Sequence, residues 1–352
     1  MERELQKEAK EVVDGLPNIN FNHLVRLTDK FGIIQFAKHI KPDKSSGYTL
    51  DDNARAMIAC CMDYSHFKSN SKLKLITIYL NFIKYVQQPD GSLYNYVDYN
   101  RKINLKRWTY DAHTRALWAL GYLISIKSIP QKLRNEAEKI FVKALNLTKN
   151  LKFPRSIAFT ILGLYFYNKT KPSDKNIIKI KELASKLVSL YKINSSDNWR
   201  WFEEKLTYSN SKLPEALFYA YLATKEQKYL QIAESSLDFL SSVTIENGMF
   251  IPIGNKGWYN KNGKRAYFDQ QPVDTASMVQ TLILAHKITK NKQQLKDVHN
   301  VFQWFLGNNS LNQTVYDESA GGCRDGISES SINPNQGAES TILYLMARLT
   351  MI

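Results

Sequence analysis

The sequence predicts an all-α protein with the (α/α)6 toroid fold, an inner ring of six buried helices inside an outer ring of six amphipathic helices. Two observations predict it. A short polar lead-in to a nearly all-apolar helix recurs along the chain, and one-sided amphipathic segments separate these repeats. No strand-rich region and no linker divides the chain, so we expect one toroid domain over residues 1–352.

The six segments expected to form the inner ring are rich in apolar and small residues around the whole helix. Such helices are buried on every side. Their equivalent lead-in positions are separated by 59, 45, 59, 59 and 65 residues, and regular internal repeats indicate a repeated structural unit. The segments are 51–62, 111–123, 154–167, 213–223, 272–285 and 337–349.

The segments between these repeats carry apolar residues on one face only. Residues 131–149 and 291–307 show the 3.6-residue period of an amphipathic surface helix. The charged N-terminal segment, residues 1–16, is expected to be the sixth outer helix, which closes the ring.

The connections from outer to inner segments are long, whereas those from inner to outer segments are short. In an alternating ring, all connections of one direction emerge at the same end, and long ordered loops often carry a binding site. The long connections span about 89–110, 193–213, 244–272 and 308–337, and hold four of the six tryptophans. We therefore expect the site at this end of the ring.

Five of the six inner segments begin with an acid. Capping is one interpretation, because the first turn of a helix exposes unpaired N–H groups and the positive end of its dipole. The alternative is a site, because crowded carboxylates raise one another's pKa and can keep one of them protonated near neutral pH. Carboxylates and amides beside tryptophans also suit sugars. The acids are Asp52, Asp111, Glu215, Asp274 and Glu339.

Carboxylate acid/base catalysis needs two carboxyl groups, one to protonate the leaving oxygen and one to activate water or attack the anomeric carbon. The sequence favours Asp52 and Glu204 as this pair, with Asp111 and Asp274 as reserves. The expected substrate-binding residues are Asp51, Asn53, Arg55, Trp108, His113, Arg115, Trp199, Trp201, Glu203, Tyr208, Glu215, Trp258, Asp269, Gln270, Gln271, Gln336 and Glu339.

Some of these residues admit a structural interpretation as well. Arg55 and Arg115 follow Asp52 and Asp111 by three and four residues, so each arginine either orients its acid or only satisfies it. His113 is a candidate base, but a single histidine at a helix start is often hydrogen-bonded scaffolding.

The composition limits the other functions. The net charge is +15, but the lysines are spread along amphipathic helices, which argues against a nucleic-acid partner. Three cysteines without a CxxC pair indicate neither zinc nor a disulfide framework. We expect no metal, no cofactor, no membrane span and, without a signal-peptide pattern, a cytoplasmic protein.

Several stretches together resemble bacterial (α/α)6 proteins of the six-hairpin glycosidase-like superfamily. They are "HLVRLTDKFGIIQFAKH", "GYTLDDNARA", "DAHTRALWALG", "WRWFEEKLTYSNSKLPEAL", "FDQQPVD" and "NQGAES". The resemblance runs from about His23 to the C-terminus and implies the toroid. Such proteins occur alone or fused to a glycosyltransferase, which implies glycan metabolism and a possible glycosyltransferase partner. Tyr110 and Thr114 depart from the pattern, since an acid and a small residue are usual there.

The leading hypothesis is a glycosidase, a hydrolase of carbohydrate metabolism that cleaves an oligosaccharide at the toroid mouth. A sugar epimerase or isomerase on the same fold is the alternative, but those relatives use histidine pairs, and only His113 is well placed among six histidines. A noncatalytic glycan-binding partner of a glycosyltransferase is the third. Whether a hydrolase inverts or retains the anomeric configuration is open.

Overall fold

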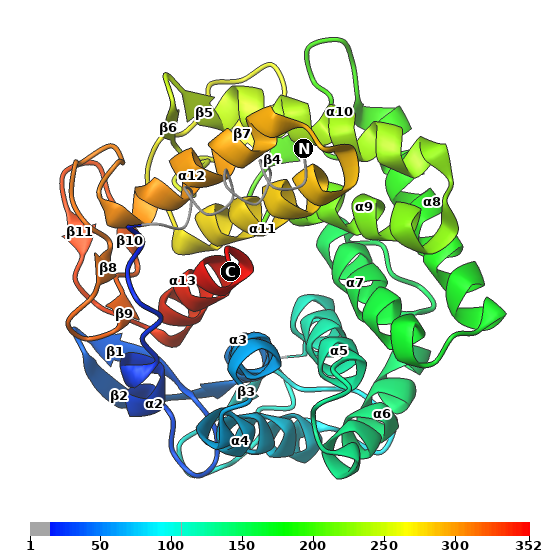
Figure 1. Ribbon diagram of the computed structural model, residues 1–352, viewed down its shortest axis with the longest axis vertical. Coiled ribbons are helices and arrows are strands. Elements are labelled where there is room, and N and C mark those ends of the chain that lie inside the picture. Colours follow the sequence, from blue (N-terminus) through cyan, green and yellow to red (C-terminus); the bar gives the residue numbers. More distant parts are fainter. Residues whose placement is uncertain (1–14, 107) are drawn as a thin grey trace.

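The computed structural model, which describes residues 15–106 and 108–352, is an (α/α)6 toroid (Figure 1). Each inner helix contacts the next, and the last contacts the first, so the ring is closed. The inner helices are α3 (Leu50–Phe67), α5 (Tyr110–Ser125), α7 (Pro154–Thr170), α9 (Lys212–Thr224), α11 (Pro272–Thr289) and α13 (Ala338–Thr350). All six predicted inner segments are confirmed.

Five outer helices each pack against the inner helix that precedes them in the chain. They are α4 (Asn70–Val86), α6 (Gln131–Leu145), α8 (Asp174–Asn194), α10 (Gln227–Thr244) and α12 (Lys292–Leu306). Their buried residues form one stripe, as the amphipathic pattern predicts; on α12 the stripe contains Val298, Val301, Phe302 and Phe305. The predicted sixth outer helix lies almost wholly in residues 1–14, outside the described residues.

The long connections carry short strands and the chain before α3 carries a hairpin, which the sequence analysis did not anticipate. The short helix α2 (Asn22–Leu27) precedes a three-stranded antiparallel sheet in the order β1-β2-β3. A 3-10 turn, η1 (Asn146–Thr148), follows α6. The strands are β1 (Ile34–Lys38), β2 (Lys41–Thr49), β3 (Tyr96–Val97), β4 (Lys205–Leu206), β5 (Ile245–Glu246), β6 (Met249–Phe250), β7 (Tyr259–Asn260), β8 (Tyr316–Asp317), β9 (Gly322–Cys323), β10 (Gly326–Ile327) and β11 (Ile332–Asn333).

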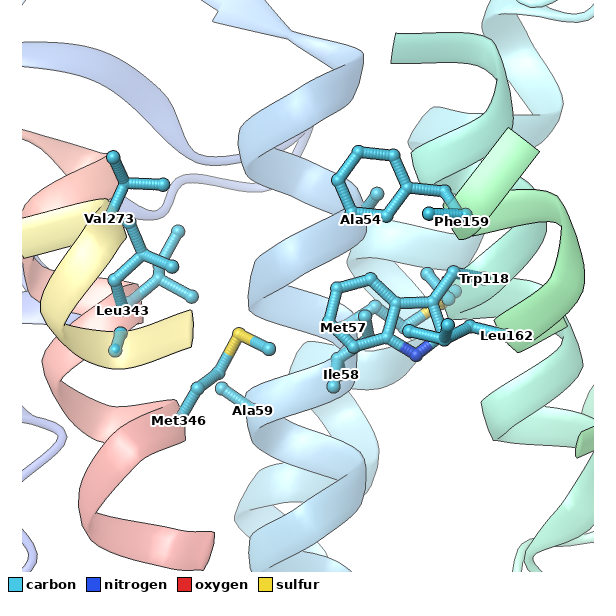
Figure 2. Close-up of a cluster of buried hydrophobic side chains, with 14 of the residues drawn as sticks. Ala54, Met57, Ile58, Ala59, Trp118, Phe159, Leu162, Val273, Leu343 and Met346 are labelled. Atoms are coloured by element: carbon cyan, nitrogen blue, oxygen red, sulfur yellow. The ribbon is translucent and has the colours of Figure 1, made fainter. Parts of the chain in front are cut away.

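Small residues allow the inner helices to approach closely. A Cβ atom on Gly121 of α5 would lie 2.2 Å from the backbone oxygen of Gly163 on α7, so only glycine fits at this crossing. Figure 2 shows apolar side chains between these helices, among them Met57, Ile58 and Trp118 where α3 meets α5, and Met346 on α13.

None of the described helices combines the length and the apolar composition that a membrane crossing requires.

Candidate functional site

Two arginines hold four carboxyl groups together at the end of the barrel where the inner helices begin. Arg55 lies 3.8 Å from Asp51, 3.3 Å from Asp52 and 2.8 Å from Glu339. Arg115 lies 2.7 Å from Asp51 through Nε and 2.7 Å from Asp111 through Nη2. We call these six residues the mouth cluster: Asp51, Asp52, Arg55, Asp111, Arg115 and Glu339. The cluster joins the first turns of α3, α5 and α13 into one charged network.

These acids do not cap their helices. Thr49 is the N-cap of α3 and accepts a hydrogen bond from the backbone N–H of Asp52, and Thr109 caps α5 in the same way through Ala112. Gly337 occupies the cap position of α13. Because threonines do the capping in α3 and α5, the capping interpretation is wrong for Asp52 and Asp111, and their carboxyl groups are available for the ion pairs of the mouth cluster.

The surroundings shift the pKa values of two acids in the cluster, Asp52 and Asp111, in opposite directions. Burial raises the pKa of Asp52 to about 7, against the opposing effect of Arg55, and Glu339 and Asp51 add to the rise. Burial acts in the same direction on Asp111, but Arg115, Arg55 and Arg155 outweigh it and hold the pKa of Asp111 below its usual value. Near neutral pH, Asp52 therefore exchanges a proton while Asp111 stays charged.

A cleft of about 400 Å³ opens beside Asp111. Its walls combine aromatic and charged side chains from the starts of α5 and α7 and from the connection before α9. The lining residues are Trp108, Thr109, Tyr110, Asp111, Phe153, Pro154, Arg155, Ser156, Glu203 and Tyr208. The indole N–H of Trp108 is buried without an acceptor among the described residues, so the cleft offers an unused donor.

Arg155 organises the wall of the cleft opposite the aromatic residues. Its Nη1 lies 2.9 Å from Glu203 Oε2, its Nε donates to the backbone oxygen of Tyr208, and its guanidinium lies 4.8 Å from the centre of the Tyr208 ring. The Tyr208 hydroxyl in turn donates to Asp111 Oδ1 over 3.3 Å. Glu203 and Asp111, both about one-quarter exposed, are thus two carboxylates that face one cleft.

Asp274 lies at the start of α11, deeper than the mouth cluster. It is buried against the backbone N–H groups of Ser209 and Asn210 and lines only a small void between α11 and α10. Burial raises its pKa to about 7.

Two carboxylates lie where the sequence analysis did not expect them. Glu204 is exposed and is absent from the cleft lining, whereas its neighbour Glu203 lines the cleft. Glu215 is buried below the mouth and pairs with Lys212 at 2.6 Å. The reason is that α9 begins beside the middle of α11: Thr281 donates to the backbone oxygen of Ser211, directly before α9.

Several predicted sugar-binding residues prove to be scaffolding. Trp199 and Trp201 are buried within the connection before α9, where both rings pack against Phe239. The side chain of Asn53 binds the backbone of Ile33 and Thr49, which ties the hairpin to α3.

His113 is also structural. Its Nδ1 accepts from Leu93 N–H, its Nε2 donates to the Ala144 oxygen, and burial lowers its pKa to about 4. These contacts favour the scaffolding interpretation for this histidine.

The remaining predicted residues lie outside the cleft lining. Gln270 is buried and binds Trp304 and Ser310, and Gln336 is buried and donates to Asp317. Trp258 packs against the core of the protein, and Asp269 and Gln271 are half-buried just before α11. Fewer of the predicted binding residues therefore line the cleft than the sequence suggests.

The sequence analysis missed Arg155 and Phe153. Arg155 occupies the second position of α7, where α3, α5 and α13 carry acids, and this difference in charge was the available signal. Phe153 directly precedes that helix and is 62% exposed, which is unusual for an aromatic residue flanking a buried segment.

The fold of the chain matches that of solved sugar-processing enzymes. A cellobiose 2-epimerase from Bacillus thermoamylovorans is 13% identical with a TM-score of 0.75, over 99% of this chain and 98% of that one. A sugar epimerase from a ruminal bacterium is 14% identical with a TM-score of 0.72, over 98% and 97%. An alpha-1,6-mannanase from a Salegentibacter species is 12% identical with a TM-score of 0.65, over 98% of each chain.

At these identities the likeness shows the (α/α)6 toroid fold, shared by epimerases and glycosidases. No model of a protein family matches the chain, and no curated protein matches its sequence.

Proposed function

We propose that the protein is a carbohydrate-active enzyme, and specifically a glycoside hydrolase that cleaves an oligosaccharide in the cleft beside the mouth cluster. The observation that carries the proposal is the pair Asp52 and Asp111. They belong to one ion-pair network, yet their pKa values are shifted in opposite directions. Two carboxyl groups pushed apart in this way suit the roles of proton donor and charged carboxylate.

In the proposed mechanism, Asp111 in the cleft lining attacks the anomeric carbon or activates water. Asp52, which is buried in the mouth cluster outside that lining, supplies the proton for the leaving oxygen. The Thr49 hydroxyl donates to Asp52 Oδ2 over 2.6 Å and orients the carboxyl group. Arg115 and the Tyr208 hydroxyl hold Asp111 charged and in place. Glu203 replaces Glu204 as the carboxylate across the cleft, where it binds a sugar hydroxyl.

The walls of the cleft fit a sugar ring. Phe153, Tyr110 and Trp108 present aromatic surface, and the free indole N–H of Trp108 can donate to a hydroxyl. Glu203 and Arg155 supply an acceptor and donors on the other side. The mouth cluster has four carboxyl groups for two guanidinium groups, so we expect a neutral rather than an acidic glycan.

A sugar epimerase is the second candidate, because the solved epimerases cover almost the whole chain. Proton transfer beside a carbonyl would need a base in the cleft. None of the six histidines, all within the described residues, lines it, and His23 and His113 are buried and hydrogen-bonded to backbone oxygens. This favours hydrolysis. A glycosyltransferase partner stays a prediction on which the proposal does not depend.

The test is to incubate the protein with manno-, gluco- and galacto-oligosaccharides in D2O and to follow the products by NMR. We expect new reducing-end signals that disappear in Asp52→Asn and persist in Asp174→Asn, an exposed acid at the start of the outer helix α8. The anomeric configuration of the product that forms first, compared with that of the substrate, shows whether the enzyme inverts or retains it.

Three results would count against parts of the proposal. Deuterium exchange at C2 without cleavage would identify an epimerase. Cleavage that persists in Asp52→Asn would remove the proton-donor role from that residue. NMR chemical-shift changes without turnover of any oligosaccharide in the panel would indicate a glycan-binding protein.

A further inference from the structure

We infer that the end of the barrel opposite the mouth holds a second binding site, which takes a small phenol. A cavity of about 310 Å³ lies there, where the inner helices end, and all six inner helices contribute to its lining. This volume lies at the lower end of the range of small-molecule pockets. The site is distinct from that of the proposed hydrolysis, since the cavity and the mouth cleft share no lining residue.

Aromatic rings form much of the wall. Trp118, Tyr122, Phe166 and Tyr219 line the cavity, and Tyr122 and Tyr219 both contact the Phe166 ring, at centroid distances of 4.8 and 5.3 Å. Aromatic rings packed edge-on in this way form a surface on which another aromatic ring packs well.

One buried donor at the cavity has no acceptor. The Trp118 side chain is 5% exposed, and its indole N–H lacks a hydrogen-bond partner among the described residues. Phe159 stacks on the ring at 5.9 Å, and Lys212 Nζ lies 4.6 Å from the ring centre, so the indole is held in one orientation. A buried unpaired N–H is costly, and a ligand acceptor would satisfy it.

The inner part of the cavity also supplies an acceptor. Lys212 Nζ donates to Glu215 Oε2 and to Gln280 Oε1, each over 2.6 Å, and both of these residues line the cavity. Among the described residues, none donates a hydrogen bond to Glu215 Oε1, so this oxygen can accept from a ligand. Lys212 and Glu215 compensate each other, and Lys287 adds a further cation to the lining, so a cationic ligand is disfavoured.

A phenol matches this set of groups. Its ring fits the aromatic wall, and its hydroxyl accepts from Trp118 and donates to Glu215, which flank the same Lys212 ammonium.

The experiment is calorimetric titration of the full-length protein with p-cresol and with toluene, which lacks the hydroxyl. We expect p-cresol to bind more tightly than toluene. Trp118→Phe keeps a ring but removes the donor, and should weaken p-cresol about 3- to 10-fold with toluene unchanged. Leu284→Trp should fill the cavity and abolish binding of both, whereas Phe153→Ala in the mouth cleft should change neither.

The inference is overturned by any of four results. These are no p-cresol binding, equal affinity for toluene, no effect of Trp118→Phe on the p-cresol affinity, or loss of binding in Phe153→Ala. Glucose that displaces p-cresol would assign the cavity to sugars instead. Circular dichroism of each variant shows that a lost signal is not lost folding, and Leu284→Trp keeps the test valid if Trp118→Phe proves unstable.

Discussion

The two ends of the barrel use charged side chains in different ways. At the mouth, four carboxyl groups share Arg55 and Arg115, and Asp51, Asp111 and Glu339 are partly exposed. Toward the other end, one ammonium and one carboxylate, Lys212 and Glu215, are almost completely buried. An incompletely compensated, solvated network can exchange protons and bind hydroxyls. A compensated, buried pair has its main effect on folding.

The largest effect that separates the ends is expected for Asp111→Asn. The change removes the charge that Arg115 and Tyr208 hold at the cleft while keeping the shape of the side chain. We expect turnover to fall about 10²- to 10⁴-fold with little change in unfolding free energy. Initial rates with the oligosaccharide found by NMR provide the measurement. Full activity in this variant would exclude Asp111 from the reaction.

At the other end, Lys212→Met should affect stability instead. It leaves the Glu215 carboxylate buried without its partner, which typically costs about 3–5 kcal/mol. Glu339→Gln at the mouth is the matched control. Its side chain is 44% exposed and Arg55 keeps two other carboxylates, so a cost below about 1 kcal/mol is expected. Urea unfolding compares the two variants, and equal losses would contradict the distinction between the ends.

The pH dependence of turnover should reflect the mouth cluster. Asp52 is a proton donor only while protonated, so with a pKa of about 7 we expect kcat/KM to fall roughly tenfold per pH unit above 7. The native state also keeps a proton that the unfolded chain releases near pH 4, so stability falls as the pH rises from about 4 to 7. Asp52→Asn should remove the contribution of Asp52 to this change of the unfolding free energy with pH. A rate that stays flat to pH 9 would rule out Asp52 as the donor.

A smaller effect should distinguish two adjacent acids. Glu203→Gln breaks the charged contact with Arg155 in the cleft, and we expect kcat/KM to fall about 10- to 100-fold. Glu204→Gln, one residue along and exposed, should leave kcat/KM unchanged. Steady-state kinetics on both variants is sufficient. The reverse pattern would restore Glu204 to the catalytic pair.

The sequence was sufficient for the fold, because burial imposes a pattern on every helix. The apolar segments and the one-sided stripe of α12 follow from which faces contact the core. It was also sufficient to place Asp111, Arg115 and Trp108 at one end, since the direction of the connections determines which helix starts lie together.

The sequence could not predict the directions in which side chains point within the long connections between helices. The sequence suggests that Trp199 stacks on a sugar, but its ring packs against Phe239. The sequence also favours Glu204 for the cleft, but it is Glu203 that lines it. Glu215 was misplaced because the depth at which α9 starts depends on a tertiary contact, Thr281 with Ser211, that no local pattern encodes. Helix propensity and periodicity carry no information on either point.

The smallest expected effect compares two exposed phenylalanines. Phe153 is 62% exposed and lines the mouth cleft, and Phe67 is 59% exposed at the far end of α3. Both replacements by alanine remove a similar apolar surface from water, so they should change stability alike. Only Phe153→Ala removes a face on which a sugar ring packs, and we expect KM to rise about 3- to 10-fold with kcat unchanged. A rise in KM for Phe67→Ala would mean that the substrate extends to the other end, and the separation of the two sites would then be wrong.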